Sequence, residues 1–242
     1  MVSLRGRCGI TTSGVHLASS TVEDYLKTLY AMHQASGEMG ALPVGRLAAA
    51  MGVVPGTATA MMKTLADAGL VHYESRAGVR LSDKGERLAL HVLRRHRLVE
   101  LLLVEVLGLD WSVVHEEADR LEHAISDRVL EKIDLLLGHP TVDPHGDPIP
   151  TSKGKLHEAA FMSLADCHTG LRHRVTRVLN QDIGFLQFVE QRGLRPGAIV
   201  VVEERDAEAD TSTIKVIGRD SKSLSLAVAA QILVAAEVAH NA

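Results

Sequence analysis

Residues 43–82 read PVGRLAAAMGVVPGTATAMMKTLADAGLVHYESRAGVRLS, and this stretch decides the fold of the N-terminal part of the chain. Pro43 and Gly52 bracket a short helix, and Pro55 and Gly69 bracket a second, because proline favours the first turn of a helix and glycine its end. Two short β-like runs, LVHYES and VRLS, follow around RAG. Helix, tight turn, helix and hairpin in this order are typical of a winged helix-turn-helix.

Helical periodicity also flanks this stretch on both sides. The segments with apolar residues at helical spacing are 21–36, 84–107, 111–125 and 127–137. Asp110 is expected to cap the third of these and Ser126 the fourth. The remainder of the chain mixes β-branched runs with glycine and proline turns, which predicts a small β-barrel-like domain. The predicted fold class is therefore mostly α with a small β part.

Charge is unevenly distributed along the chain. The whole chain carries −4, whereas residues 20–97 carry +3 and residues 98–242 carry −9. With this distribution, only the basic N-terminal part is expected to bind the phosphates of a nucleic acid. The two cysteines, Cys8 and Cys167, have no paired spacing, which argues against a disulfide framework or a zinc ribbon and fits a reducing cytosol. No apolar run approaches the roughly 20 residues of a membrane span, so a cytoplasmic protein with no membrane partner is expected.

Side chains of the metal-ligand type gather in the helices after the winged segment. Asp119, Glu122 and His123 have offsets of three and four residues, which place them on one helical face. His115 precedes them by one turn. The preceding helix holds a second pair of this kind, His96 and Glu100. One such pair alone is usually a solvated ion pair, but two adjacent helices with such faces predict a metal site.

Three motifs stand in order along the chain. They are TVEDYLKTLY (21–30), RRHRLVELLLVEVLGLDWSVVHEEADRLEHAISDRV (94–129) and DPHGDPIP (143–150). Together they resemble the diphtheria-toxin-repressor and iron-dependent-regulator (DtxR/MntR) family, and within it the manganese transport regulator branch. The resemblance runs from about residue 21 to the C-terminus. Its HRLxE…VHxEAxxxEHxxSD pattern is highly specific, whereas the C-terminal segment matches more weakly.

The resemblance implies a domain plan and two metal sites. The expected segments are a flexible N-terminal arm (1–20), a winged helix-turn-helix DNA-binding domain (21–90), metal-binding and dimerisation helices (91–140), a linker (141–157) and an SH3-like FeoA-type β domain (158–242). The primary site would comprise Asp24, Asp119, Glu122 and His123. The ancillary site would comprise His96, Glu100 and His115. Asp182 stands about where some members lend a carboxylate to the ancillary metal, although a solvated loop acid is the simpler interpretation of it.

The sequence departs from the family pattern in an informative way. The iron-sensing members have a methionine where Asp24 stands and a cysteine where Asp119 stands. Sulfur ligands suit Fe(II) and softer ions, whereas oxygen ligands with one imidazole suit Mn(II). Lys27 occupies a position where some manganese regulators have a glutamate ligand, so it cannot contribute. Asp143 and Asp147 replace the serine and asparagine with which the iron sensors hold an anion.

The implied function is a Mn(II)-dependent transcriptional regulator, with two ions per subunit, that represses manganese-uptake genes when loaded. An Fe(II)-dependent repressor of iron-uptake genes with the same fold is the alternative. The partners would be double-stranded DNA with a palindromic operator and a second copy of the chain, because one subunit buries little DNA.

The helix after Pro55 is the expected recognition helix, because small residues let it enter the major groove. Base contacts are predicted from Gly56, Thr57, Thr59 and Ala60. Phosphate contacts, which add affinity without sequence information, are predicted from Arg46, Lys63 and Arg76.

Two other classes of function compete with this interpretation. A cluster of histidine and carboxylate could activate water in a metalloenzyme. No HExxH motif is present, and a winged helix stands directly upstream, so no enzymatic activity is expected. Metal-independent DNA binding with vestigial ligands is the other rival, and the complete ligand set argues against it.

Overall fold

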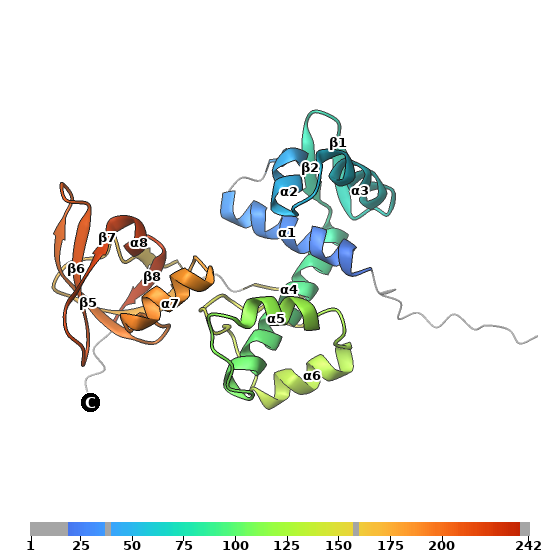
Figure 1. The fold of residues 1–242 in the computed structure, drawn as a ribbon. Helices are drawn as coiled ribbons and strands as arrows, with labels where there is room; N and C mark the ends of the chain where they lie inside the picture. Colours follow the sequence, from blue (N-terminus) through green and yellow to red (C-terminus); the bar gives the residue numbers. More distant parts are fainter. Residues whose placement is uncertain (1–18, 37–39, 157–159, 238–242) are drawn as a thin grey trace, which may run out of the picture. The chain divides into compact units, whose positions relative to one another are not determined.

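The computed structural model describes residues 19–36, 40–156 and 160–237, and the chain divides into two compact units at residues 89 and 90. Most of the predicted N-terminal arm, with Cys8, lies outside the described residues. The elements of the first unit, coloured blue to cyan in Figure 1, are α1 (Ser20–Ser36), α2 (Val44–Ala50), α3 (Pro55–Asp67), β1 (Val71–Glu74) and β2 (Gly78–Leu81). This order confirms the predicted winged helix-turn-helix.

Local sequence explains how this unit forms. Pro55 stands at the start of α3, and the chain leaves the helix through Gly69 at a φ of +70°. β1 and β2 pair antiparallel, and Leu42 bridges to Val79 beside them. Gly78 must lack a side chain, because a Cβ there would lie 2.5 Å from the Leu42 carbonyl oxygen. The fully buried side chains that close the core are Leu26, Leu29, Leu47, Met62, Leu65 and Val79.

The long helix α4 (Asp83–Glu105) begins in the first unit and supplies the first helix of the second. Ser82 Oγ accepts a hydrogen bond from the backbone N–H of Gly85 at 3.1 Å. Helices α5 (Val114–Leu121) and α6 (Asp127–Leu136) follow α4 in the chain. The predicted cap of the last helix is confirmed, because the Ser126 side chain accepts from the backbone N–H of Val129.

The helix predicted over 111–125 is shorter than expected. The Asp110 cap is wrong, because α5 starts only at Val114, after Val113. Asp110 instead accepts the backbone N–H of Ser112 at 2.8 Å, and this local bond forms a turn that the helix does not include. Glu122 is the C-cap of α5 and keeps helical dihedrals and a backbone bond to Ala118, so the helical-face prediction holds for Asp119 and Glu122, whereas His123 lies in the turn that follows.

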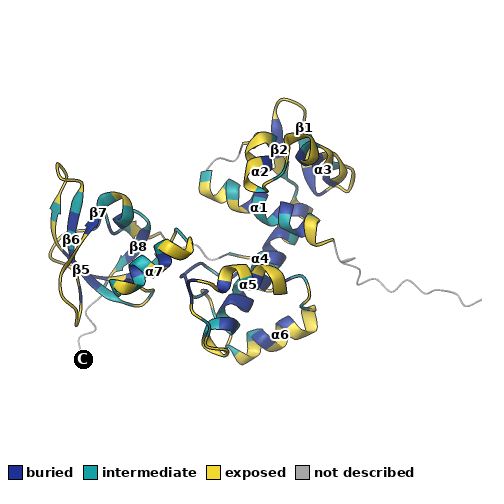
Figure 2. Ribbon diagram, in the orientation of Figure 1, coloured by how far each residue is buried: buried dark blue, intermediate teal, exposed yellow. Residues whose placement is uncertain are grey.

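The C-terminal part of the second unit confirms the predicted β domain. Its six strands form an antiparallel sheet in the order β3-β8-β4-β5-β6-β7. The elements are β3 (Met162–Ser163), β4 (Arg172–Val178), α7 (Ile183–Gln191), β5 (Ile199–Asp206), β6 (Thr211–Val216), β7 (Lys222–Ser225), α8 (Leu226–Ala229) and β8 (Ile232–Ala236). Figure 2 shows the alternation of buried and exposed positions along these strands, which is expected for a sheet with one buried face.

The loop between α6 and the β domain is ordered over residues 139–156 and partly buried. The His145 carbonyl accepts the backbone N–H of Val178 on β4 at 2.9 Å. Gly146 adopts a φ of +88°, and a Cβ there would lie 1.9 Å from the Thr176 carbonyl oxygen. The loop therefore lies directly against β4, and this contact fixes the positions of the loop side chains.

Candidate metal centre and nucleic-acid interface

Three side chains predicted for the ancillary site lie together in the second unit. His96 and Glu100 stand one turn apart on α4, and His115 stands on α5. Glu100 Oε1, His96 Nε2 and His115 Nδ1 form a triangle in which each pair of atoms is 3.0 Å apart. We call these three residues the outer cluster. An octahedral ion with bonds of about 2.1 Å places adjacent donors about 3.0 Å apart, so this arrangement fits a divalent cation.

His96 also connects the outer cluster to residues predicted for the primary site. Its Nδ1 lies 2.7 Å from Glu122 Oε2 and 3.2 Å from Asp119 Oδ1. Glu122 is fully buried, and its other oxygen lies 3.4 Å from His123 Nε2. Asp119 is exposed over 47% of its side chain. Asp24 lies on α1 in the first unit, and its membership of the primary set stays a prediction.

The charges in this network are strongly coupled. Burial opposes a charge on His96, but the carboxylates of Asp119, Glu100 and Glu122 hold the pKa of its imidazole well above the usual value. Burial likewise opposes a charge on Glu100, and its contacts with His115 and His96 nevertheless hold the pKa of this carboxyl well below the usual range. His96 therefore has carboxylates on both sides of its ring, and a divalent cation bound among these groups would displace a proton from its imidazole.

A second group of metal-ligand side chains was missed by sequence analysis as a site. Glu100, Asp143 and His145 are all buried, and each offers a donor atom within 4.8 Å of the others. We call these three residues the inner cluster; it shares Glu100 with the outer cluster. The signal is in the DPHG motif, where an acid and a histidine two residues apart flank a proline, whereas the family resemblance points only to an anion contact at Asp143.

The inner cluster contains donor atoms without hydrogen bonds. Asp143 Oδ1 accepts the backbone N–H groups of His145 and Asp147, at 2.8 and 2.9 Å. Asp143 Oδ2 lies 3.6 Å from Arg97 Nε, an ion pair without hydrogen-bond geometry, and no described residue forms a hydrogen bond with this oxygen or with His145 Nδ1. Burial, followed by the nearby Asp147 and Glu100, raises the pKa of Asp143 well above its usual value. A buried polar atom without a hydrogen bond is costly, and a cation bound here would offset that cost.

Asp182 lies at the N-terminus of α7, where its side chain makes no capping bond. It lines a hollow of about 300 Å³ together with His115, Glu116 and Gln181. This placement is compatible with the predicted supply of a carboxylate near the outer cluster.

The residues predicted to contact DNA lie on the surface of the first unit. Gly56, Thr57, Ala60 and Lys63 are exposed along α3, and Arg46 is exposed on α2. The opposite face of α3 is buried through Ala58, Met62 and Leu65. The Thr59 hydroxyl donates to the Pro55 carbonyl at 2.9 Å, so this group is already engaged within the helix.

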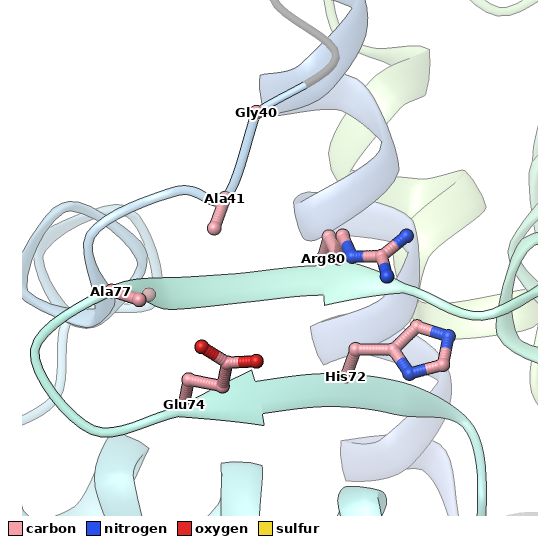
Figure 3. A pocket seen from close by; sticks show the side chains of 7 residues that line it. Gly40, Ala41, His72, Glu74, Ala77 and Arg80 are labelled. Carbon is pink, nitrogen blue, oxygen red and sulfur yellow. The ribbon is translucent and has the colours of Figure 1, made fainter.

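The wing adds further cations to this surface. Arg76 stands in the turn between the strands with a φ of +75°, and Arg80 is exposed on β2. Figure 3 shows Arg80 with His72 and Glu74 around a hollow of about 300 Å³ beside the hairpin.

Comparison with known proteins covers all three parts of the chain. Residues 17–79 match the model of the iron dependent repressor N-terminal DNA binding domain. Residues 82–151 match the iron dependent repressor metal binding and dimerisation domain, and residues 162–236 match the FeoA domain. The iron-dependent repressor IdeR of Mycobacterium tuberculosis is 31% identical over 196 residues, which cover 76% of this chain and 84% of that protein. The chain belongs to the diphtheria-toxin-repressor family.

Other members of this repressor family support the assignment. The diphtheria toxin repressor of Corynebacterium efficiens is 36% identical over 131 residues, 54% of this chain and 55% of that protein. A solved manganese-dependent transcriptional repressor in complex with manganese is 34% identical, with a TM-score of 0.78, and the match covers 89% of this chain and all of that one.

Family membership fixes the function at a coarse level. The chain is a metal-dependent transcriptional repressor that binds DNA and forms a homodimer, and its relatives are repressors rather than enzymes. Its cofactor is a divalent metal ion. Among the residues whose structure is described, none of the helices has the length and apolar character needed to span a bilayer.

Proposed function

We propose that this repressor senses Mn(II) and represses manganese-uptake genes when the metal is bound. The observation that carries the proposal is the chemistry of the donors: every side chain in the inner and outer clusters, and in the predicted primary set, is an imidazole or a carboxylate. Carboxylate ligands suit Mn(II), whereas sulfur ligands suit softer ions, and the predicted primary set has three carboxylates and one imidazole. The solved relative that contains manganese supports this choice.

We propose two metal positions per subunit. The primary position would use Asp119, Glu122 and His123, with Asp24 from the first unit as the predicted fourth ligand. The second would lie at Glu100, held either by His96 and His115 of the outer cluster or by Asp143 and His145 of the inner cluster. A bound divalent ion would supply positive charge that holds these carboxylates together.

The chain's own residues suggest how the signal reaches DNA. Without metal, the acids of the primary set would repel one another. With metal, α1 would be fixed to the dimerisation helices, and the two recognition helices of a dimer would gain the spacing of successive major grooves. The exposed apolar side chains of α5 and α6, including Leu121, Val129, Leu135 and Leu136, are the proposed dimer surface. The operator would be palindromic, and the protein would act in the cytoplasm.

An Fe(II)-dependent repressor is the second candidate, because the mycobacterial relatives carry that description at 31% identity. Fluorescence anisotropy with chelator-stripped protein and DNA from upstream of a manganese-importer gene separates the two. Titration under anaerobic conditions should give specific binding at lower Mn(II) than Fe(II). Equal or better binding with Fe(II) would reject the manganese assignment.

A further inference from the structure

Trp111 joins the metal-binding region to the C-terminal β domain. This tryptophan, the only one in the chain, lies between α4 and α5 and is 2% exposed. Its side chain belongs to the hydrophobic core of the β domain, with Leu186 and Val189 of α7 among its members. The indole N–H donates to Glu190, and the Arg195 guanidinium lies 5.0 Å from the ring centre. Arg195 and Glu190 are themselves paired at 2.5 Å.

The same residue contacts His145 of the inner cluster. The two rings are stacked with centroids 5.4 Å apart and an interplanar angle of 29°. The Trp111 carbonyl oxygen lies 2.8 Å from His145 Nε2. A carbonyl oxygen can only accept, so Nε2 must carry the proton.

This hydrogen bond determines which atom of His145 can bind a metal. A neutral imidazole with its proton on Nε2 has its lone pair on Nδ1. Nδ1 is also the buried atom of His145 that no described residue pairs with. Metal-bound histidines commonly donate their other ring N–H to a carbonyl or carboxylate, which fixes both the tautomer and the ring orientation. The Trp111 carbonyl occupies that place here.

We infer that Trp111 is a positioning residue for the inner cluster: its indole is anchored in the β domain, and its carbonyl holds His145 with Nδ1 free to bind the divalent cation. Docking of the β domain and metal binding at Glu100, Asp143 and His145 then support each other. This inference rests on the proposed assignment of the inner cluster as a metal position. It also gives the C-terminal domain a role in sensing that needs no metal ligand from that domain.

The test is Mn(II) binding to the full-length protein, with free Mn(II) measured from its electron paramagnetic resonance signal. The binding phase that disappears in His145→Gln belongs to the inner cluster. Trp111→Ala should weaken that phase by about 10- to 100-fold, the usual effect of removing a residue that orients a metal ligand. Trp111→Phe keeps an aromatic anchor and should restore most of the affinity. Leu186→Ala, in the same β-domain core, is the matched control: it keeps the Trp111 ring against His145 and should weaken the phase much less than Trp111→Ala does.

The outcomes separate the inference from the assignment on which it rests. If His145→Gln removes no phase, the inner cluster is not a metal position and the inference falls with it. If the phase exists but Trp111→Ala binds like wild type, or Leu186→Ala weakens binding equally, Trp111 does not position His145. Long-range ¹H–¹⁵N spectra of the metal-free wild type give a readout that needs no variant. They should show His145 protonated at Nε2, and protonation at Nδ1 would overturn the inference.

Discussion

His96 Nδ1 lies 2.7 Å from Glu122 Oε2, and this contact joins the middle of α4 to the end of α5. The family resemblance assigns His96 to the ancillary site and Glu122 to the primary site. The two predicted sites are therefore adjacent in one polar network, with His96 between them. A cation bound at one position changes the charge felt by the other.

The first prediction concerns pH and the stability of the metal-free protein. The carboxylates around His96 raise its pKa in the folded state against the effect of burial. A raised histidine pKa contributes stability that is fully present below the unfolded value of about 6.5 and is lost as pH rises through the folded value. The free energy of unfolding in urea, measured with chelator present, should therefore fall from pH 6 to pH 9. His96→Gln should flatten this slope, and an unchanged slope would show that another group is responsible.

The second prediction separates metal response from folding at Asp119. Asp119→Ala should abolish Mn(II)-dependent DNA binding while leaving a folded dimer, because this side chain is about half exposed and a surface ion pair contributes about 1 kcal/mol or less. Anisotropy measures the first effect, and size-exclusion chromatography with circular dichroism measures the second. Glu116→Ala on the same helix is the control, since Glu116 pairs with Arg120 on the surface. A wild-type response of the Asp119 variant would remove it from the primary site.

The third prediction concerns the loop that carries Asp143 and His145. Gly146→Ala places a Cβ 1.9 Å from the Thr176 carbonyl oxygen, so the loop must move away from β4. The variant should lose the Mn(II)-binding phase of the inner cluster. Gly138→Ala is a matched control, because Gly138 also has a positive φ of +73° but a Cβ there meets nothing within 4 Å. That control should cost only the backbone strain of a non-glycine residue at positive φ, about 1–2 kcal/mol, and keep the phase. Equal metal binding by both variants would contradict the placement of the loop.

The fourth prediction divides the DNA surface into two kinds of contact. Lys63→Ala should weaken binding to all sequences about equally and reduce the slope of log affinity against log salt by about 1, because it removes one phosphate contact. Thr57→Ala should change the preference among operator variants and leave the salt slope unchanged. Anisotropy titrations at several salt concentrations, with wild-type and single-substituted operators, measure both. The reverse pattern would mean that α3 lies differently in the groove.

Much of the architecture was determined by the sequence. Proline and glycine at 43, 52, 55 and 69 bracket the two helices of the winged unit because these residues act on the backbone locally, whatever surrounds them. Ser126 is a cap for the same reason. His96 and Glu100 lie on one face of α4 because they are four residues apart in a long helix. His115 lies near them on α5, the next helix in the chain.

Tertiary structure decided what local spacing could not. The α5 helix ends at Leu121 with Glu122 as its cap, so His123 reaches the network from the turn after the helix. Asp143 and His145 become donors beside Glu100 only because the loop is fixed against β4 and buried. Trp111 stands at the start of the helix predicted over residues 111–125. Its burial, however, depends on the β domain, whose buried core residues lie more than 50 positions later in the chain. A buried side chain loses its contact with water, so its environment depends on residues that are distant in the sequence. The periodicity of one segment does not show which distant residues these are.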